Sequence, residues 1–115
     1  DDAESLTMSA DGWIQSIGQK PESLDEIEAQ YIGLMRFKGK GLQFLKDYMV
    51  SISETARFTR MYMTDLLQDL VNQKNSIKAV KINSGWLEID SVKDYEIVGK
   101  KFADATISEF FDPRK

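Results

Sequence analysis

Hydrophobic and polar residues follow two different periods along the chain, and the changes between them predict the order of its elements. Residues 6–17 hold two short apolar runs around Ala10-Asp11-Gly12. Asp-Gly between such runs is a typical hairpin turn, because glycine accepts a positive φ. Residues 31–37, YIGLMRF, form a compact apolar run that predicts a buried strand. The first third of the chain is therefore expected to be mainly extended, with an irregular link over residues 18–30.

Apolar residues then recur at helical spacing. Residues 42–52 and 63–71 each place them three or four positions apart, which predicts two amphipathic helices. Thr64 stands where its hydroxyl could cap the second of these. Further along, Ser91 and Asp94 have the spacing of a capping box, which predicts a third helix reaching Phe102.

Two more extended segments are expected before that third helix. Residues 77–82, IKAVKI, alternate with a strict period of two and predict a strand with one buried face. Residues 86–90, WLEID, form a short extended run. Together the elements predict an α/β fold with a small mixed sheet, a β-hairpin and about three helices.

Composition removes several classes of function. The 115 residues include no cysteine and no histidine. A thiol nucleophile, a disulfide frame, a Ser-His-Asp triad and a zinc or haem site built from thiolate or imidazole are therefore excluded. A metal ion bound by this chain would be a hard ion held by oxygen atoms.

Charge and hydropathy limit the kinds of partner that the chain is expected to bind. The net charge is −4 and the pI is about 4.8, which argues against binding of nucleic acid through its phosphate backbone. No run of about 18 apolar residues is present, so no membrane span is predicted. The acidic start, DDAESL, does not resemble a signal peptide, and the lack of cysteine fits a reducing compartment such as the cytoplasm.

The strongest candidate chemistry lies in the run WLEID. Strand alternation would point Glu88 and Asp90 to the same side, about 7 Å apart. One or two carboxylates together with substrate phosphates are a typical Mg²⁺ site. The alternative is a solvated acidic pair beside a helix start.

Three basic residues could bind a phosphate group. Arg57 and Arg60 flank Phe58 shortly before the second helix, where a guanidinium could bind a phosphate in bidentate fashion. A solvent-exposed helix face explains both equally well. Lys20 could reach an acceptor phosphate, or it is an ordinary loop lysine.

Glycine and aromatic positions carry a second set of alternatives. Gly33 either lets a substrate lie against the backbone or relieves packing against a neighbouring helix. The aromatic rings could line a pocket for a cationic head group, or they belong to the core. They are Trp13, Tyr31, Tyr62 and Trp86.

The order of these motifs resembles a known family. YIGLMRF, a helix, YMTDLLQDLV and then IKAVKINSGWLEIDSVKDYEIV resemble the C-terminal, acceptor-side half of nucleotidyltransferases of the phosphocholine cytidylyltransferase and sugar-phosphate nucleotidyltransferase type. The family pattern W-x-E-[IV]-D-[ST]-x-x-D is matched over residues 86–94. The resemblance implies part of a Rossmann-like fold of the nucleotide-diphospho-sugar-transferase type.

The resemblance also implies roles for residues. Asp90 would be the Mg²⁺ ligand and catalytic residue, and Glu88 would lie in or near the acceptor pocket. The resemblance also implies a substrate contact for Gly33. Tyr31, Trp86, Lys20 and Arg57, the candidates that their own chemistry suggests, complete the predicted substrate-binding set. The family reaction joins an NTP, expected here to be CTP, to a small phosphorylated acceptor and releases pyrophosphate.

The glycine-rich T-R loop of the family's nucleotide-binding half has no counterpart in the sequence. Gly39 and Gly41 lie in Lys-Gly-Lys-Gly and indicate a turn, with a phosphate cradle as the alternative. Because the chain also begins with Asp1, residues 1–115 are expected to be a single partial domain that is inactive alone. The alternatives are a non-catalytic α/β binding module and an oligomerisation module that pairs two copies through Phe110 and Phe111.

Overall fold

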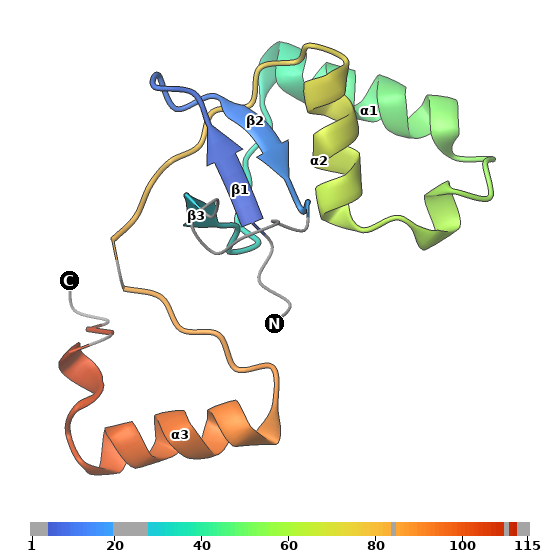
Figure 1. Cartoon of the computed structure of the whole chain (residues 1–115). Helices are drawn as coiled ribbons and strands as arrows, with labels where there is room; N and C mark the ends of the chain where they lie inside the picture. The colour runs from blue at the N-terminus through green and yellow to red at the C-terminus, as the bar shows by residue number, and fades with distance from the viewer. Residues whose placement is uncertain (1–4, 20–27, 84, 110, 113–115) are drawn as a thin grey trace. The chain divides into compact units, whose positions relative to one another are not determined.

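The computed structural model describes residues 5–19, 28–83, 85–109 and 111–112. The chain divides into two compact units, Asp1–Val80 and Lys81–Lys115. Their described residues contain three β-strands and three α-helices (Figure 1). The predicted α/β class, the hairpin and the three helices are confirmed. None of the described helices has the length and apolarity needed to cross a bilayer.

The first unit contains a small antiparallel sheet. Strand β1 (Ser5–Met8) pairs with β2 (Ile14–Ile17) on one side and with β3 (Ala29–Gln30) on the other, in the order β2-β1-β3. Gly12 has a φ of +79° in the hairpin turn, as the Asp-Gly signal predicts. Both pairings are antiparallel, so the described strands contain no parallel pair of the kind a mixed sheet would have.

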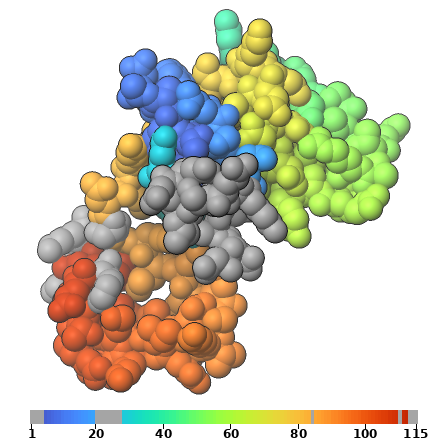
Figure 2. Space-filling model, viewed as in Figure 1, coloured from blue at the N-terminus to red at the C-terminus, as the bar shows by residue number. Residues whose placement is uncertain are grey.

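The core lies between the hairpin and α2 (Met63–Asn72). Leu6, Met8 and Ile17 are buried on one face of the hairpin and cluster with Leu67 of α2. Figure 2 shows the hairpin atoms (blue) directly beside those of α2 (yellow-green). The backbone N–H of Ile17 also donates to the Gln68 side chain at 2.8 Å. The apolar face of the hairpin, with a period of two, therefore packs against the apolar face of the helix, with a period of 3.6, in one core layer.

Both predicted helices of this unit are present. Helix α1 (Gly39–Ile52) begins three residues earlier than the apolar pattern predicts. Helix α2 is capped differently from the prediction: the backbone N–H of Tyr62 donates to Asp65 at 2.8 Å. Thr64 was expected to cap, but it lies inside the helix and is only 6% exposed.

The predicted strand over residues 31–37 is wrong, because this segment has no regular structure. Gly33 has a φ of +79°, which is incompatible with a continuing strand. Tyr31 and Phe37 still pack against the core cluster. The apolar run therefore reflects the packing of its two end residues against the core, and not the pairing of a strand.

The predicted strand over residues 77–82 is also wrong except at one position. Lys78 forms an isolated antiparallel bridge with Trp13, and its ammonium lies 4.8 Å from the centre of the indole. Beyond the bridge, Val80 is 85% exposed and Ile82 is 55% exposed. Pairing with the hairpin is limited to the residues around Lys78, where the Ile77 carbonyl accepts from the Ile14 N–H and the Ala79 N–H donates to the Gly12 carbonyl, both at 2.9 Å.

The second unit consists of an extended segment and helix α3 (Val92–Ala103), followed by a short 3-10 helix, η3 (Ile107–Glu109). The predicted capping box is present: the Asp94 N–H donates to Ser91 Oγ at 3.2 Å, and the Ser91 N–H donates to Asp94 Oδ2 at 3.0 Å. Residues 86–90 form no strand, which corrects that prediction. Without a pleat, alternation no longer places Glu88 and Asp90 on one face.

Candidate functional site

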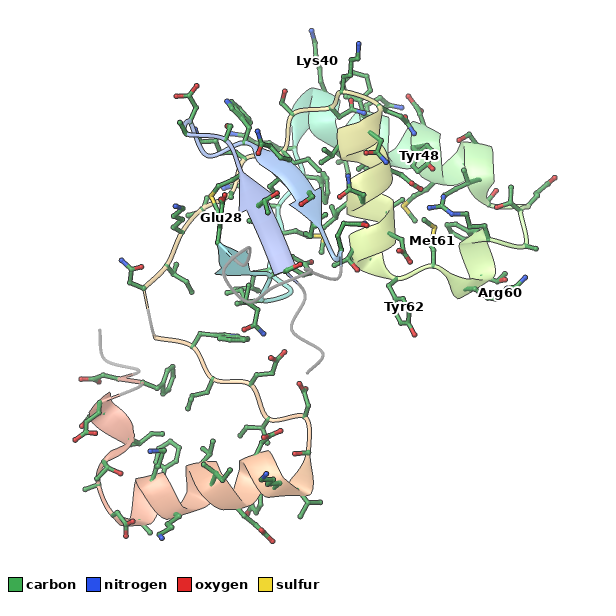
Figure 3. All side chains as sticks on the ribbon, viewed as in Figure 1. Glu28, Lys40, Tyr48, Arg60, Met61 and Tyr62 are labelled. Carbon is green, nitrogen blue, oxygen red and sulfur yellow. The ribbon has the colours of Figure 1, made fainter. Side chains whose placement is uncertain are left out.

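A pocket of about 400 Å³ opens on the first unit where the 3-10 helix η2 (Phe58–Arg60) leads into α2. Figure 3 shows Arg60, Met61 and Tyr62 along this connection. The lining combines guanidinium groups, a thioether and a carboxylate in a short stretch of chain. Its members are Arg57, Arg60, Met61 and Asp65.

Arg57 forms an ion pair with Asp69 on α2. Its Nη1 and Nη2 groups donate to the two carboxylate oxygens at 2.5 Å and 3.0 Å. The hydroxyl of Tyr48 on α1 donates to the same carboxylate at 2.7 Å. This bidentate pair fixes the plane of the guanidinium and ties α1, η2 and α2 together.

The contacts shift the pKa values of all three groups. Hydrogen bonding to Arg57 lowers the pKa of Asp69, and the bond to Asp69 raises the pKa of Arg57 and of Tyr48. The Asp69 side chain is 18% exposed, whereas that of Arg57 is 55% exposed. Asp69 is therefore ionised throughout the neutral range, and the pair orients a solvent-facing cation.

The Asp69 pair is expected to contribute to acid unfolding. A carboxylate whose folded pKa is depressed stabilises the fold above its unfolded pKa, near 3.8, and that contribution is lost as the pH falls through the folded pKa. Asp69→Asn should therefore be less stable than the wild type at pH 7, with the difference shrinking below about pH 4. Urea unfolding at several pH values measures it.

Asp47→Asn is the matched control for that experiment, because Asp47 is exposed and an asparagine oxygen can still accept its hydrogen bond from Gln43. Its stability should follow the wild type at every pH. A constant difference between Asp69→Asn and the wild type from pH 7 to pH 3 would contradict the assignment of the pH effect to Asp69.

In the second unit, Asp90 lies directly before α3. Its backbone N–H donates to Asp94 Oδ2 at 3.3 Å, and the Ser91 hydroxyl donates to the same oxygen at 2.7 Å. These bonds, chiefly the one from Ser91, lower the pKa of Asp94. The Asp90 carboxylate is exposed and makes no hydrogen bond or ion pair with a described residue.

The described residues contain no group of three or more acidic side chains close enough to hold a metal ion. Asp90 and Glu88 are both exposed, and Asp94 is occupied by the helix cap. One free carboxylate fits an Mg²⁺ ion that takes its remaining ligands from phosphates and water. It does not fit an ion held by this chain alone.

The other predicted site residues fall in different places. Gly33 lies in the first unit, and no described atom is within 4 Å of a Cβ built on it, so it does not relieve packing. Tyr31 belongs to the core edge, which favours the core alternative for that ring, whereas Tyr62 is 75% exposed. Trp86 is half-buried in the second unit. Lys20 lies outside the described residues.

Sequence reasoning missed the residues that hold Arg57. Tyr48 and Asp69 are 21 positions apart in the sequence and lie on different helices. Nothing in the residues around either one predicts their contact. Asp69 stands among the apolar positions of α2, and a carboxylate beside a buried helix face is a signal that a cation is near. Asp65, in the first turn of α2, also lines the pocket.

Comparison with known proteins bears on the kind of protein that the chain resembles. No protein-family model matches the chain, and no solved structure matches it. A curated protein, CTP:phosphoglutamine cytidylyltransferase of Campylobacter jejuni subsp. jejuni serotype O:2, is 40% identical to it over 105 residues. The chain is similar to a cytidylyltransferase.

The similarity covers 84% of this chain and 40% of that cytidylyltransferase, so the chain spans less than half of the relative's length. This supports the predicted cytidylyltransferase-like domain. Phosphocholine as the acceptor, and the place of the matching segment in the C-terminal half, stay predictions.

Proposed function

We propose that this chain is the acceptor-side portion of a cytidylyltransferase, which transfers CMP from CTP to a small phosphorylated acceptor and releases pyrophosphate. The observation that carries the proposal is the similarity over 84% of the chain to a protein named for CTP and phosphoglutamine. The motif over residues 86–94 and the arginine-lined pocket are the parts of the chain that suit phosphate chemistry.

The reaction requires cations that offset the charge of the phosphate groups, and it requires that the reacting phosphates be held in position. Four phosphate groups meet when CTP approaches a phosphorylated acceptor, and their repulsion must be offset by cations. Covalent help from the protein is unnecessary if the attacking phosphate is held in line with the bond that breaks. Arg60 and Arg57 are the cationic side chains that would bind the acceptor phosphate.

Asp90 would hold Mg²⁺ for this reaction, with Glu88 near the acceptor. When bound, the ion supplies positive charge at the reacting phosphate. Asp90 suits this role because its carboxylate has no partner among the described residues, while the neighbouring Asp94 keeps the start of α3 in place. The capping box therefore fixes the backbone that carries a free carboxylate.

A transfer assay tests the function. The full-length protein that contains this chain, incubated with CTP, Mg²⁺ and a panel of phosphorylated amino acids, amines and sugars, should release pyrophosphate with at least one acceptor. The 115-residue chain alone should release none, because it has no counterpart of the glycine-rich nucleotide loop.

Two results would contradict the proposal. Pyrophosphate release by the 115-residue chain alone would show that it is not an incomplete site. The lack of transfer by the full-length protein with every nucleotide and acceptor, although it is folded, would favour a non-catalytic binding module.

A further inference from the structure

The pocket beside η2 contains one guanidinium that is free to bind a ligand. The Nε–H of Arg60 donates to the carbonyl of Ala56 at 3.4 Å, which leaves its two terminal nitrogens without a partner among the described residues. Arg60 is exposed and lines the pocket, and Figure 3 labels its side chain by the connection that leads into α2. A planar guanidinium with two free N–H₂ groups matches an oxyanion in bidentate geometry.

Arg57 adds a second cation to the same pocket. Each of its terminal nitrogens carries two hydrogens and uses one for Asp69, so N–H groups remain available on the exposed side. Because Asp69 and Tyr48 hold the guanidinium from behind, its orientation is set before a ligand arrives. Less conformational freedom is then lost on binding.

A carboxylate limits what the pocket can accept. Asp65 Oδ2 accepts the Tyr62 N–H, and its Oδ1 makes no hydrogen bond with a described residue. A ligand that carried only negative charge would be repelled by this group. A ligand with an ammonium group next to its oxyanion would satisfy both sides of the pocket.

We propose that the pocket lined by Arg57, Arg60, Met61 and Asp65 binds a small zwitterionic molecule, with its oxyanion on Arg60 and Arg57 and its ammonium group on Asp65. The assignment rests on the proposed function to the extent that this molecule is the acceptor. It makes Arg60 and Asp65 specificity-determining residues.

Direct binding to the 115-residue chain tests this separately from transfer. Amide chemical shifts are followed during titration with phosphoethanolamine, which has both groups, and with ethyl phosphate, which has the oxyanion only. Shift changes should centre on residues 57–65, and phosphoethanolamine should bind about threefold more tightly, which is typical of an exposed charge pair.

Two variants separate the two charges. Arg60→Gln should weaken the binding of both compounds several-fold, whereas Arg36→Gln, a matched change at an exposed arginine outside the pocket, should leave it unchanged. Asp65→Asn keeps an oxygen for the Tyr62 N–H and removes the charge, so it should abolish the preference for phosphoethanolamine.

Three outcomes would overturn the inference: equal binding of the two compounds by the wild type, equal effects of Arg60→Gln and Arg36→Gln, or a preference that survives in Asp65→Asn. Any of these alongside intact CMP transfer by the full-length protein would refute the pocket and leave the proposed function standing. Binding as described, without transfer to any acceptor, would refute only the function.

Discussion

Asp90→Asn is expected to lower the rate of CMP transfer by the full-length protein by about 10²–10³-fold, the cost typical of removing one preorganised charge contact to a reacting group. Asparagine keeps the size of the side chain but removes the charge that would hold Mg²⁺. Stability should change by less than about 0.5 kcal/mol, because the Asp90 side chain has no described partner and only its backbone N–H joins the cap. Initial rates over a range of Mg²⁺ concentrations measure the effect.

Asp104→Asn is the control for this experiment, since Asp104 is an exposed aspartate at the other end of α3. It should transfer CMP at the wild-type rate. If Asp90→Asn remains folded and transfers CMP as fast as Asp104→Asn, the residues WLEID are ordinary architecture and Asp90 is not the metal ligand.

Gly18→Ala is expected to destabilise the first unit by about 2–5 kcal/mol. Gly18 ends the hairpin with a φ of +68°, a conformation that costs a residue with a Cβ about 1–2 kcal/mol. A Cβ there would also lie 2.7 Å from the Cβ of Thr64, which is buried in the first turn of α2. Two packed elements would have to separate. Urea unfolding measures the loss.

Gly33→Ala is the control that measures the backbone part of this effect without the steric clash. Gly33 also has a positive φ, +79°, but no described atom lies within 4 Å of a Cβ placed on it. It should therefore show only the backbone cost, about 1–2 kcal/mol. Equal destabilisation by the two substitutions would mean that Thr64 can move aside and that the hairpin does not pack tightly on α2.

Local sequence determined the elements whose hydrogen bonds close within a short stretch of chain. The α-helices were predicted from apolar spacing or from a capping box, each of which lies within one segment. Ser91 with Asp94 marked the start of α3 correctly, whereas Thr64 does not cap α2. The hairpin followed from Asp11-Gly12 in the same way. These elements require no distant partner to be recognised.

The three other predicted strands depended on partners that a sequence pattern cannot supply. Alternation shows which face of a segment is apolar, but a strand exists only where a neighbouring backbone accepts its hydrogen bonds. Residues 31–37 are interrupted at Gly33. Residues 77–82 pair with the hairpin only at the bridge around Lys78, and residues 86–90 pair with no described residue.

The sequence by itself determined the helices, the hairpin, the exclusion of thiol and imidazole chemistry, and the candidate carboxylate Asp90. Only the tertiary structure decided that Asp69 and Tyr48 hold Arg57 and that Arg60 is the guanidinium left free beside Asp65. The physical reason is distance along the chain. Charge pairs form between side chains that the packing of the helices and η2 brings together. The local sequence pattern does not show which of the two arginines, Arg57 or Arg60, pairs with Asp69.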